Sequence, residues 1–323
     1  MLKKIIILGI TAILSLCGAA ELLAQKYPDR PITLVIPMAP GDALDVVGRL
    51  MGEELSKLLK VPVSPLNKPG ASSTLGTDMV AKAKKDGYTI LLANNASMAI
   101  TKILEPEIVS YDPFKDFTPL GLSHNVPAIV VAQKDTPYKN LKGLVEYAKK
   151  NPQKIRCGTP GVKSIAGFNI ELIQVLTDTN ITGVPFKGAT PSVAALLGGH
   201  IEIGSLVVTP YLPHLRSGEV RGMVISKHFP EFSDIPTLKQ LGYGQDLIEV
   251  WGAFFAPADV PEQVIGTLVP ALEKVVRNPA ISSKLADLGI QSAEYETPDK
   301  IFIRLSKEYK MVEEITKRFK MGK

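Results

Sequence analysis

The stretch that decides the fold is residues 32–59, ITLVIPMAPGDALDVVGRLMGEELSKLL. It begins with a strand-like run, Ile32–Ile36, turns at Pro37–Gly41, and continues as an amphipathic segment. A strand, a tight turn and a helix in this order form the first unit of an α/β sheet. Apolar residues recur at helical spacing in the amphipathic segment, at Val46, Val47, Leu50, Leu55, Leu58 and Leu59.

Strand-like and helix-like segments keep alternating after this first unit, without an internal repeat of fixed period. The length favours two α/β lobes of about 100 residues each over one large sheet. The alternation predicts mostly parallel sheets covered by helices. The expected strands are Val61–Val63, Tyr88–Ala93, Ala128–Ala132, Ile155–Gly158, Gly183–Pro185, Ile201–Val208 and Val220–Ser226, and the expected helices are Leu75–Ala83, Leu141–Lys149, Ile165–Leu176 and Pro191–Leu197.

The C-terminal part is predicted to be a helical tail that packs back onto the first lobe. Its helices are expected at Pro261–Arg277, Ala280–Leu288 and Pro298–Lys320. Before them, Val250–Ala256 is expected to form a buried strand near the return crossover. Two crossings between lobes make a hinge, and a hinge makes a cleft that can close. We expect lobe 1 to comprise residues 25–127 and 228–323, and lobe 2 residues 128–227.

The first 24 residues have the pattern of a secretory signal peptide. Two lysines, Lys3 and Lys4, precede the apolar run Ile5–Leu16, which is shorter than the ~20 residues that span a bilayer. Small residues follow, and cleavage is expected after Ala20 or Ala24. We therefore treat residues 1–24 as the signal peptide and the mature protein as exported.

The two cysteines predict no disulfide in the mature chain. Cys17 lies in the signal segment, and a lipid anchor there is not expected because Leu16 is bulky where a small residue is required. Cys157 is then left alone. We expect it to be a small buried hydrophobe at the end of a strand, since nothing in the sequence shows a histidine that approaches it.

The charge of the chain is mildly positive. The formal net charge is +5 for the whole sequence, and it becomes +4 without the signal segment, which contains two lysines and one glutamate. This excess favours anionic ligands in the long-range field. No dense Lys/Arg cluster and no interleaving of aromatic and basic residues marks a nucleic-acid face, so nucleic acid is not an expected partner.

Three loops that precede helices carry small residues and backbone donors suited to a carboxylate. They are Pro40–Ala43, Asn67–Thr74 and Gly158–Ser164. The unpaired N–H groups and the positive dipole end of a helix N-terminus bind anions. The plainer alternative is that Gly41 only permits a tight turn, that Asp42 caps the helix, and that the other loops are surface turns.

Signatures of enzymes and of nucleotide-binding proteins are missing from the sequence. In the third loop Val162 separates Gly161 from Lys163, so the Gly-Lys-Ser/Thr ending of a nucleotide P-loop is absent. Neither the nucleophile elbow G-x-S-x-G nor the zinc motif H-E-x-x-H occurs. No metal, cofactor or catalytic residue is therefore predicted. Surface or interlobe positions are expected for the four dispersed histidines, His124, His200, His214 and His228.

Several short motifs occur in a fixed order along the chain. They are Tyr27–Pro31 (YPDRP), Asn67–Gly70 (NKPG), Asp86–Thr89 (DGYT), Tyr111–Phe117 (YDPFKDF), Val184–Gly188 (VPFKG), Leu197–Ile201 (LGGHI) and Phe255–Pro257 (FAP). As a set they resemble the Bug (Bordetella uptake gene) family, the extracytoplasmic solute receptors of tripartite tricarboxylate transporters. The resemblance covers essentially all of residues 27–320.

This resemblance implies a periplasmic binding protein of the two-lobe, Venus-flytrap type, without catalysis or cofactor. It implies a monomer that hands a small organic carboxylate to the permease subunits of a membrane transporter. Backbone groups of the loops Met38–Ala43, Ala71–Thr74 and Thr159–Ser164 would hold the carboxylate, often with ordered water, and Asn94–Ser97 and Ser205 would be further contacts. The ligand-binding residues expected on this basis are Met38, Gly41, Asp42, Ala43, Ser72, Ser73, Asn94, Thr159, Gly161, Lys163, Ser164 and Ser205.

Departures from the family pattern lie where specificity is decided. Asp42 replaces the usual second glycine of the first loop, and Lys163 occupies a position of the third loop that is often small. Ser72-Ser73-Thr74 stands for the usual Ala-Gly-Gly, and Gly204-Ser205 for the usual Phe-Asp. An aspartate beside a carboxylate site weakens binding of the carboxylate unless a nearby cation compensates its negative charge.

Three explanations of this charge pair are open. Lys163 reaches Asp42 from the second lobe on closure, or the ligand itself carries a positive or donor group. Otherwise Asp42 only caps the first helix and Lys163 is solvated.

Two other classes of protein share this fold. An exported enzyme would use the same cleft and would need a hydrogen-bonded catalytic pair of side chains there, whereas a receptor has backbone-lined loops. The effector domain of a transcription regulator is disfavoured by the signal peptide and by the lack of an N-terminal DNA-binding helix pair. The sequence does not name the solute.

Overall fold

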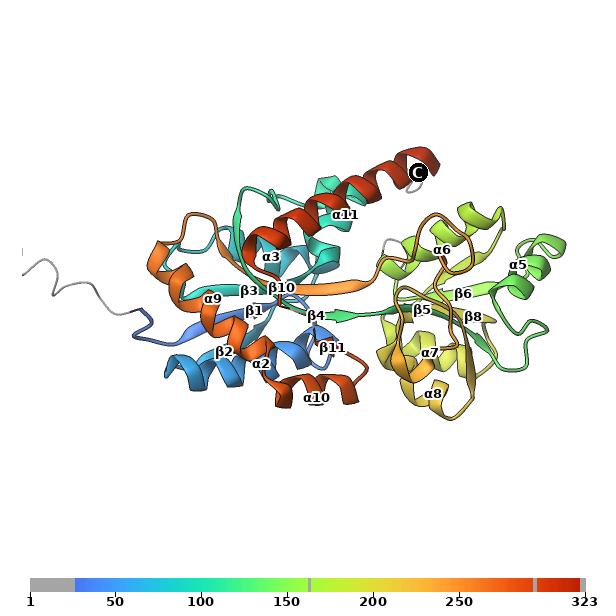
Figure 1. The fold of residues 1–323 in the computed structure, drawn as a ribbon. Coiled ribbons are helices and arrows are strands. Elements are labelled where there is room, and N and C mark those ends of the chain that lie inside the picture. Colours follow the sequence, from blue (N-terminus) through green and yellow to red (C-terminus); the bar gives the residue numbers. More distant parts are fainter. Residues whose placement is uncertain (1–26, 162–163, 293–294, 320–323) are drawn as a thin grey trace, which may run out of the picture.

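The computed structural model describes residues 27–161, 164–292 and 295–319, and arranges them as two α/β lobes side by side (Figure 1). Each lobe has its own β-sheet with helices on both faces, so the predicted two-lobe fold is confirmed. The predicted signal segment, residues 1–24, lies outside the described residues, as does Cys17.

Lobe 1 contains a six-stranded sheet within the described residues, in the order β11-β4-β10-β3-β1-β2. Its strands are β1 (Ile32–Ile36), β2 (Val63–Asn67), β3 (Thr89–Asn94), β4 (Phe117–Val126), β10 (Val250–Pro257) and β11 (Gln291–Ser292). Its helices are α2 (Ala43–Leu59), α3 (Thr74–Ala81), α4 (Thr101–Leu104), α9 (Glu262–Val276), α10 (Pro279–Asp287) and α11 (Pro298–Phe319).

Lobe 2 contains a five-stranded sheet within the described residues, in the order β7-β6-β8-β5-β9. Its strands are β5 (Ala128–Gln133), β6 (Arg156–Thr159), β7 (Thr182–Pro185), β8 (Ile203–Val207) and β9 (Val220–Ile225). Its helices are α5 (Leu141–Lys150), α6 (Ile165–Thr177), α7 (Ala189–Leu197) and α8 (Leu212–Arg216).

The sheets are mixed, which corrects the expectation of mostly parallel sheets. Strand β1 is parallel to β2 and β3, and β6 is parallel to β7 and β8. Strand β10 is antiparallel to β3 and β4, and β5 is antiparallel to β8 and β9. The antiparallel strands β4, β5 and β10 are those next to the two passages of the chain between the lobes, so their direction follows from the crossings rather than from strand–helix–strand units.

The core of lobe 1 follows from the alternation of side chains along β1. Ile32, Leu34 and Ile36 are fully buried in the same cluster as the apolar face of α2. Val35 points to the opposite face and joins a second cluster that includes Ile301 and Leu305 of α11. Burying each such aliphatic side chain contributes about 1.5–3 kcal/mol. Both faces of the strand are therefore fixed in place, and so is the turn that follows it.

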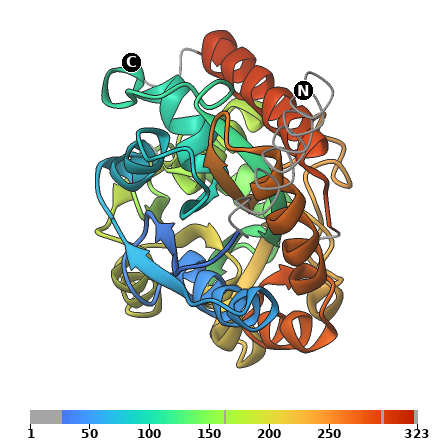
Figure 2. The same cartoon turned by 90° about the vertical axis from the view of Figure 1, so that its left-hand side faces the viewer.

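The C-terminal helices pack on lobe 1, as predicted. Helix α9 lies against α2 and β4, and α11 lies against β4 and α4. Figure 2 views the molecule along its long axis, with α11 (red) above the strands of lobe 1 and α2 (blue) below them. The tail thus completes lobe 1 rather than forming a third body.

Two segments connect the lobes, and buried hydrogen bonds hold the second of them on both sides. The first passes directly from β4 to β5 through Pro127. In the return segment, Asn169 of α6 donates from Nδ2 to the Ile248 carbonyl (2.9 Å) and accepts from the Ile248 N–H (2.8 Å). Asn95 of lobe 1 donates to the Glu249 carbonyl (3.0 Å) and accepts from the Trp251 N–H (3.2 Å). The return crossing therefore lies in the peptides between Ile248 and Trp251, which side chains of both lobes hold by hydrogen bonds.

Candidate ligand-binding site

A cavity of about 430 Å³ lies between the lobes, and residues of both lobes line it. Small-molecule sites typically have volumes of about 300–1,000 Å³. The predicted ligand residues that line this cavity are Met38, Asp42, Ala43, Ser72, Ser73, Asn94, Gly161 and Ser164. Ala96 and Pro160, which belong to the expected segments Asn94–Ser97 and Thr159–Ser164, also line it. The lining residues outside the expected segments are Leu44, Thr101, His124, Val126, Ala128, Ile165, Ala166, Gly188, Ala189, Leu206, Val207 and Val250.

Four predicted ligand residues do not appear among these lining residues. Gly41 lies in the turn behind Asp42, and Thr159 and Ser205 are buried in lobe 2. The Ser205 hydroxyl donates to the Ala166 carbonyl (3.0 Å), so it is used within the lobe. Lys163 lies outside the described residues, so an Asp42–Lys163 pair stays a prediction.

The first loop places a carboxylate at the lobe 1 wall. Gly41 has φ +84°, a left-handed conformation that favours glycine, and it turns the chain into α2. Asp42 is the N-cap of α2, and its Oδ1 accepts a hydrogen bond from the Leu44 N–H (3.0 Å). Burial raises the pKa of Asp42, and the nearby Asp45 adds to this effect. Asp42 therefore does cap the helix, as one alternative held, but it also faces the cavity.

A second carboxylate, Asp45, holds this loop from inside. It is 2% exposed and accepts hydrogen bonds from the Gly41 N–H (2.9 Å), Asn67 Nδ2 (2.8 Å) and Arg49 Nε (3.0 Å). Burial alone would raise the pKa of Asp45, but these bonds outweigh it and hold the pKa below its usual range. Asn67 also donates to the Met38 carbonyl (3.1 Å). The network ties the β1–α2 turn to the end of β2, and the sequence pattern alone does not reveal it.

The second loop has an unusual backbone. Ala71, Ser72 and Ser73 have φ values of 45°, 53° and 73° in succession, all in the left-handed region. Such residues cost of order 1 kcal/mol each unless surrounding contacts fix them, and they cluster at functional sites. Thr74 Oγ1 donates to the Ala71 carbonyl (2.7 Å), and Ser73 Oγ donates to the Met38 sulfur (3.0 Å). The strained loop is thus fastened to the first loop, at the cavity.

The lobe 2 wall is built on the N-terminus of α6. Ser164 is its N-cap: Oγ accepts from the Gly167 N–H (3.1 Å) and donates to the Gly161 carbonyl (2.6 Å). Thr159 Oγ1 donates to the same carbonyl (3.2 Å). Both hydroxyls therefore shape the loop, which leaves backbone N–H groups at the start of α6 for the cavity.

Four helices direct their N-termini at this one cavity. The first N–H groups of a helix have no partner inside it, and the helix dipole makes that end positive. Among the described residues that line the cavity there is no lysine or arginine, so these N–H groups are its source of positive potential. The lining residues at the helix starts are Ala43 and Leu44 (α2), Ser73 (α3), Ser164, Ile165 and Ala166 (α6), and Gly188 and Ala189 (α7).

His124 is a lining residue that was not among the expected ligand contacts, although an interlobe position was one of the two expected for the histidines. It lies on β4, is 1% exposed, and its Nδ1 is 2.8 Å from Ser123 Oγ. The Ser123 hydroxyl has one hydrogen, and it donates to the Gly252 carbonyl (2.7 Å). Nδ1 must therefore carry the proton and donate to Ser123, which leaves Nε2 as an acceptor. Burial lowers the pKa of His124 to about 4, so the ring is neutral at physiological pH.

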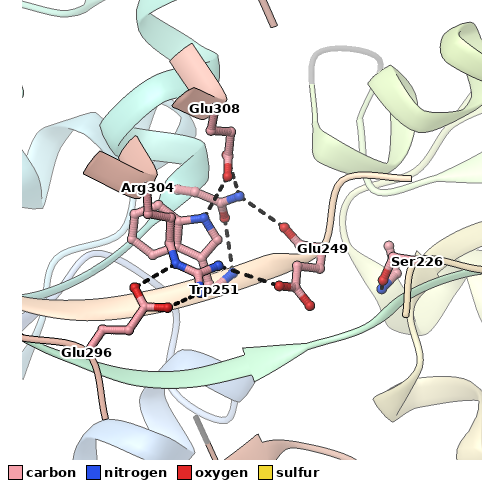
Figure 3. Close-up of polar contacts among 8 residues, drawn as sticks. Ser226, Glu249, Trp251, Glu296, Arg304 and Glu308 are labelled. Carbon is pink, nitrogen blue, oxygen red and sulfur yellow. Dashed lines mark hydrogen bonds and ion pairs between the residues drawn. The ribbon is translucent and has the colours of Figure 1, made fainter. Parts of the chain in front are cut away.

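A half-buried carboxylate cluster braces the return segment next to the cavity (Figure 3). Glu308 of α11 accepts hydrogen bonds from Trp251 Nε1 (2.6 Å) and Asn95 Nδ2 (2.6 Å). Arg304, one turn earlier, pairs with Glu296 and lies 3.6 Å from Glu249. Burial raises the pKa of Glu308 to about 7. The last helix is therefore joined directly to β10, the strand that follows the return crossing.

Cys157 is fully buried on β6, as predicted for a structural cysteine. Burial raises the pKa of its thiol, which suppresses the reactive thiolate. The described residues contain no cluster of three His, Cys, Asp or Glu side chains that could hold a metal ion. Within the same residues, no helix is long and apolar enough to cross a membrane.

Comparison with known proteins places the chain among solute receptors. Residues 47–316 match the family described as the tripartite tricarboxylate transporter family receptor. The curated protein BugT of Bordetella pertussis is 32% identical over 287 residues, which is 87% of this chain and 86% of BugT.

Two solved structures with bound acids are also similar. MatC from Rhodopseudomonas palustris with bound malate has a TM-score of 0.78 and 28% identity, and the match covers 90% of this chain and 99% of MatC. Rpa4515 of R. palustris with adipate has a TM-score of 0.81 and 25% identity, with 91% of this chain and 98% of that chain covered. The similarity extends over both lobes in each case.

Proposed function

The chain belongs to the tripartite tricarboxylate transporter receptor family, whose model it matches over residues 47–316, and from this premise we propose that it captures a small organic carboxylate between its lobes and delivers it to a membrane permease. The resemblance to the Bug family agrees with the match to BugT. Relatives of the same fold have been solved with malate and with adipate, both small dicarboxylates.

The observation that carries this proposal is the convergence of four helix N-termini from both lobes on one cavity. A carboxylate there would accept hydrogen bonds from backbone N–H groups of α2 and α3 on one side and α6 and α7 on the other. Because contacts from both lobes form only when the cleft is closed, the ligand would favour the closed form by its differential affinity. The proposed contacts are the eight predicted residues that line the cavity: Met38, Asp42, Ala43, Ser72, Ser73, Asn94, Gly161 and Ser164.

The proposed setting is the periplasm, with residues 1–24 acting as an export signal. We propose that lobe 2 comprises residues 128–247 and lobe 1 residues 25–127 and 248–323. The expected boundary at residue 228 lies too early, because Leu238 and Leu247 pack in the core of lobe 2 and the Ile225 N–H donates to the Pro236 carbonyl (3.0 Å). Lobe 2 then holds β5 to β9, and the strands of lobe 1 lie on either side of it in sequence. The proposed partners are the permease subunits of the transporter, and the receptor acts as a monomer without a cofactor.

The exported-enzyme alternative meets a specific obstacle at Ser123 and His124. Their hydrogen-bonded side chains are the kind of pair that an enzyme would need. Ser123 is fully buried, however, and its hydroxyl hydrogen is directed to the Gly252 carbonyl (2.7 Å). The imidazole donates to the serine and so does not accept its proton, which is the reverse of an activated nucleophile. This proton order supports binding without catalysis.

The test is titration calorimetry and thermal shift with a panel of mono-, di- and tricarboxylates, aromatic acids and amino acids. We expect one acid to bind per chain and to be recovered unchanged by mass spectrometry. A ligand at 100 times its Kd should stabilise the fold by roughly 2.7 kcal/mol. Turnover of the bound acid, or no binding by any member of the panel, would contradict the proposal.

The location of the site is tested by filling the cavity from each lobe. Ala43→Leu and Ala189→Leu both enlarge a lining residue in the first turn of a helix, in lobe 1 and lobe 2 respectively. Ala280→Leu is the matched control, because Ala280 is exposed in the first turn of α10 and outside the cavity. We expect the first two to lose affinity at least tenfold while the control binds normally. Parental affinity in all three would place the site elsewhere.

A further inference from the structure

His124 lines the cavity and has an acceptor that no described residue uses. The edge of its ring that carries Nδ1 and Cε1 faces Ser123 and Gly252. The other nitrogen, Nε2, has no hydrogen-bond partner within the part of the chain that the structure describes. The side chain is 1% exposed and lines the cavity. An acceptor at a cavity wall pairs with whatever fills the cavity, so a ligand that displaces water from Nε2 keeps this hydrogen bond only if it brings a donor of its own.

The lobe 1 wall holds a second acceptor. One carboxylate oxygen of Asp42 accepts from the Leu44 N–H, and the other has no partner among the described residues. Lobe 1 therefore adds two acceptors to a cavity whose helix N-termini offer donors. A plain dicarboxylate would satisfy the N–H donors but would leave both acceptors unpaired, with a carboxylate placed near Asp42. An acid that also carries a donor group would form hydrogen bonds both with the N–H donors and with these acceptors.

We propose that His124 determines specificity: its Nε2 accepts a hydrogen bond from a hydroxyl or amino group of the ligand, so the receptor prefers hydroxy- or amino-substituted carboxylates to their unsubstituted counterparts. This inference rests on the proposed function, because it concerns the ligand of the same cavity. The ligand then carries a hydrogen-bond donor beside a carboxylate, and a hydroxyl and an amino group are distinguished by experiment.

The first experiment compares acids that differ only in the donor. Succinate, malate and aspartate share one carbon skeleton, as do glutarate, 2-hydroxyglutarate and glutamate, and both enantiomers of each substituted acid are used. By calorimetry with the full mature protein, we expect a substituted member of at least one series to bind about tenfold more tightly than its unsubstituted parent.

The second experiment assigns the preference to His124. His124→Phe keeps a planar ring but has no acceptor, and we expect it to abolish the preference, measured as the ratio of the two affinities in the same variant. His124→Gln restores a carbonyl acceptor and should restore a preference of at least threefold. Melting temperatures without ligand show that each variant is folded, and the comparison of acids in the wild-type protein does not depend on any variant.

Asp42 separates the two donor types. If the donor is an ammonium group, Asp42→Asn should lower the ratio of amino-acid affinity to hydroxy-acid affinity about tenfold. If the donor is a hydroxyl, the hydroxy acid should remain the tighter ligand of the pair in this variant. Either result is compatible with His124 as the acceptor.

Two results would overturn the inference while leaving the proposed function intact. The first is equal or tighter binding of the unsubstituted acids by the wild-type protein. The second is a donor preference that survives in His124→Phe. Failure of every acid in the panel to bind would remove the proposed function, and this inference with it.

Discussion

Gly252→Ala is the sharpest test of how His124 is held. Gly252 pairs with His124 across β10 and β4. A Cβ added at Gly252 would overlap with His124 Cε1, because the two atoms would be closer than Cβ contacts in real structures. It would also lie 2.9 Å from His124 Nδ1 and 3.1 Å from Ser123 Oγ. These atoms belong to two buried side chains that are hydrogen-bonded to each other, so moving either of them aside disturbs that bond. Glycine is required here by close approach rather than by its backbone angles.

The expected loss of stability follows from two opposing effects. Overpacking in a core costs about 1–3 kcal/mol. Replacing glycine by alanine also restricts the unfolded chain, which returns about 0.4–1 kcal/mol. We therefore expect Gly252→Ala to lower the free energy of unfolding by about 1–2 kcal/mol and the melting temperature by about 2–6 °C. The assay is thermal and urea unfolding followed by circular dichroism and by fluorescence of Trp251, the single tryptophan and the neighbour of Gly252.

Gly266→Ala is the matched control. Gly266 is exposed in the middle of α9, and a Cβ there meets nothing within 4 Å. The same chemical change should raise the free energy of unfolding by about 0.5–1 kcal/mol, because alanine is the better helix former. His124→Ala, introduced into Gly252→Ala, should cost less than in the wild-type protein, with a coupling of about 1–2 kcal/mol. Unchanged stability in Gly252→Ala, or strict additivity of the two substitutions, would refute this account of the contact.

Three further predictions concern the return crossing between the lobes and the buried cysteine. The pKa of Glu308 is raised to about 7, so between about pH 4.5 and 7 the folded state binds more protons than the unfolded state. The free energy of unfolding should therefore fall as pH rises through this window, by about 3 kcal/mol at most. Glu308→Gln should flatten this pH dependence in urea unfolding, and an unaltered slope would contradict the assignment. Asn169→Leu should cost about 2–4 kcal/mol in urea unfolding, because it leaves the buried Ile248 N–H and carbonyl without partners, and a loss below 0.5 kcal/mol would show that water replaces the amide. The Cys157 thiol should react with an aromatic disulfide reagent only as fast as the protein unfolds, and rapid reaction of the native protein would show that β6 is accessible.

The parts of the fold that the sequence predicts well are those with strong local signals. Strand β1, the glycine turn after it and helix α2 are recognisable because the spacing of the apolar residues and the residue types of the turn predict the same elements. Strand β4 is not predicted, since Pro119, Gly121 and Asn125 lower its strand propensity and its pairing with β10 is set by tertiary contacts. Because His124 sits on that strand, its place at the cavity could not be inferred either.

In the lobe 2 wall, an error of two residues in a predicted helix start had a similar effect on the predicted site. The predicted helix at Pro191–Leu197 begins two residues earlier, at Ala189. Proline is common in the first turn of a helix, so Pro191 marks the start only approximately. That shift hid Gly188 and Ala189 as cavity residues. The loops Met38–Ala43 and Ala71–Thr74 were found because they immediately precede helices with clear apolar periodicity.

The strand order of lobe 1 has a consequence for how the protein is made. Strand β10 sits between β3 and β4, yet it lies more than 120 residues after β4 in sequence, so the sheet has an open centre until residues 250–257 have emerged. Lobe 2 needs no strand from outside residues 128–225, and its sheet has all its strands long before then. The lobe that begins first is therefore completed last, and a chain interrupted before β10 keeps two unpaired apolar strand edges exposed to aggregation.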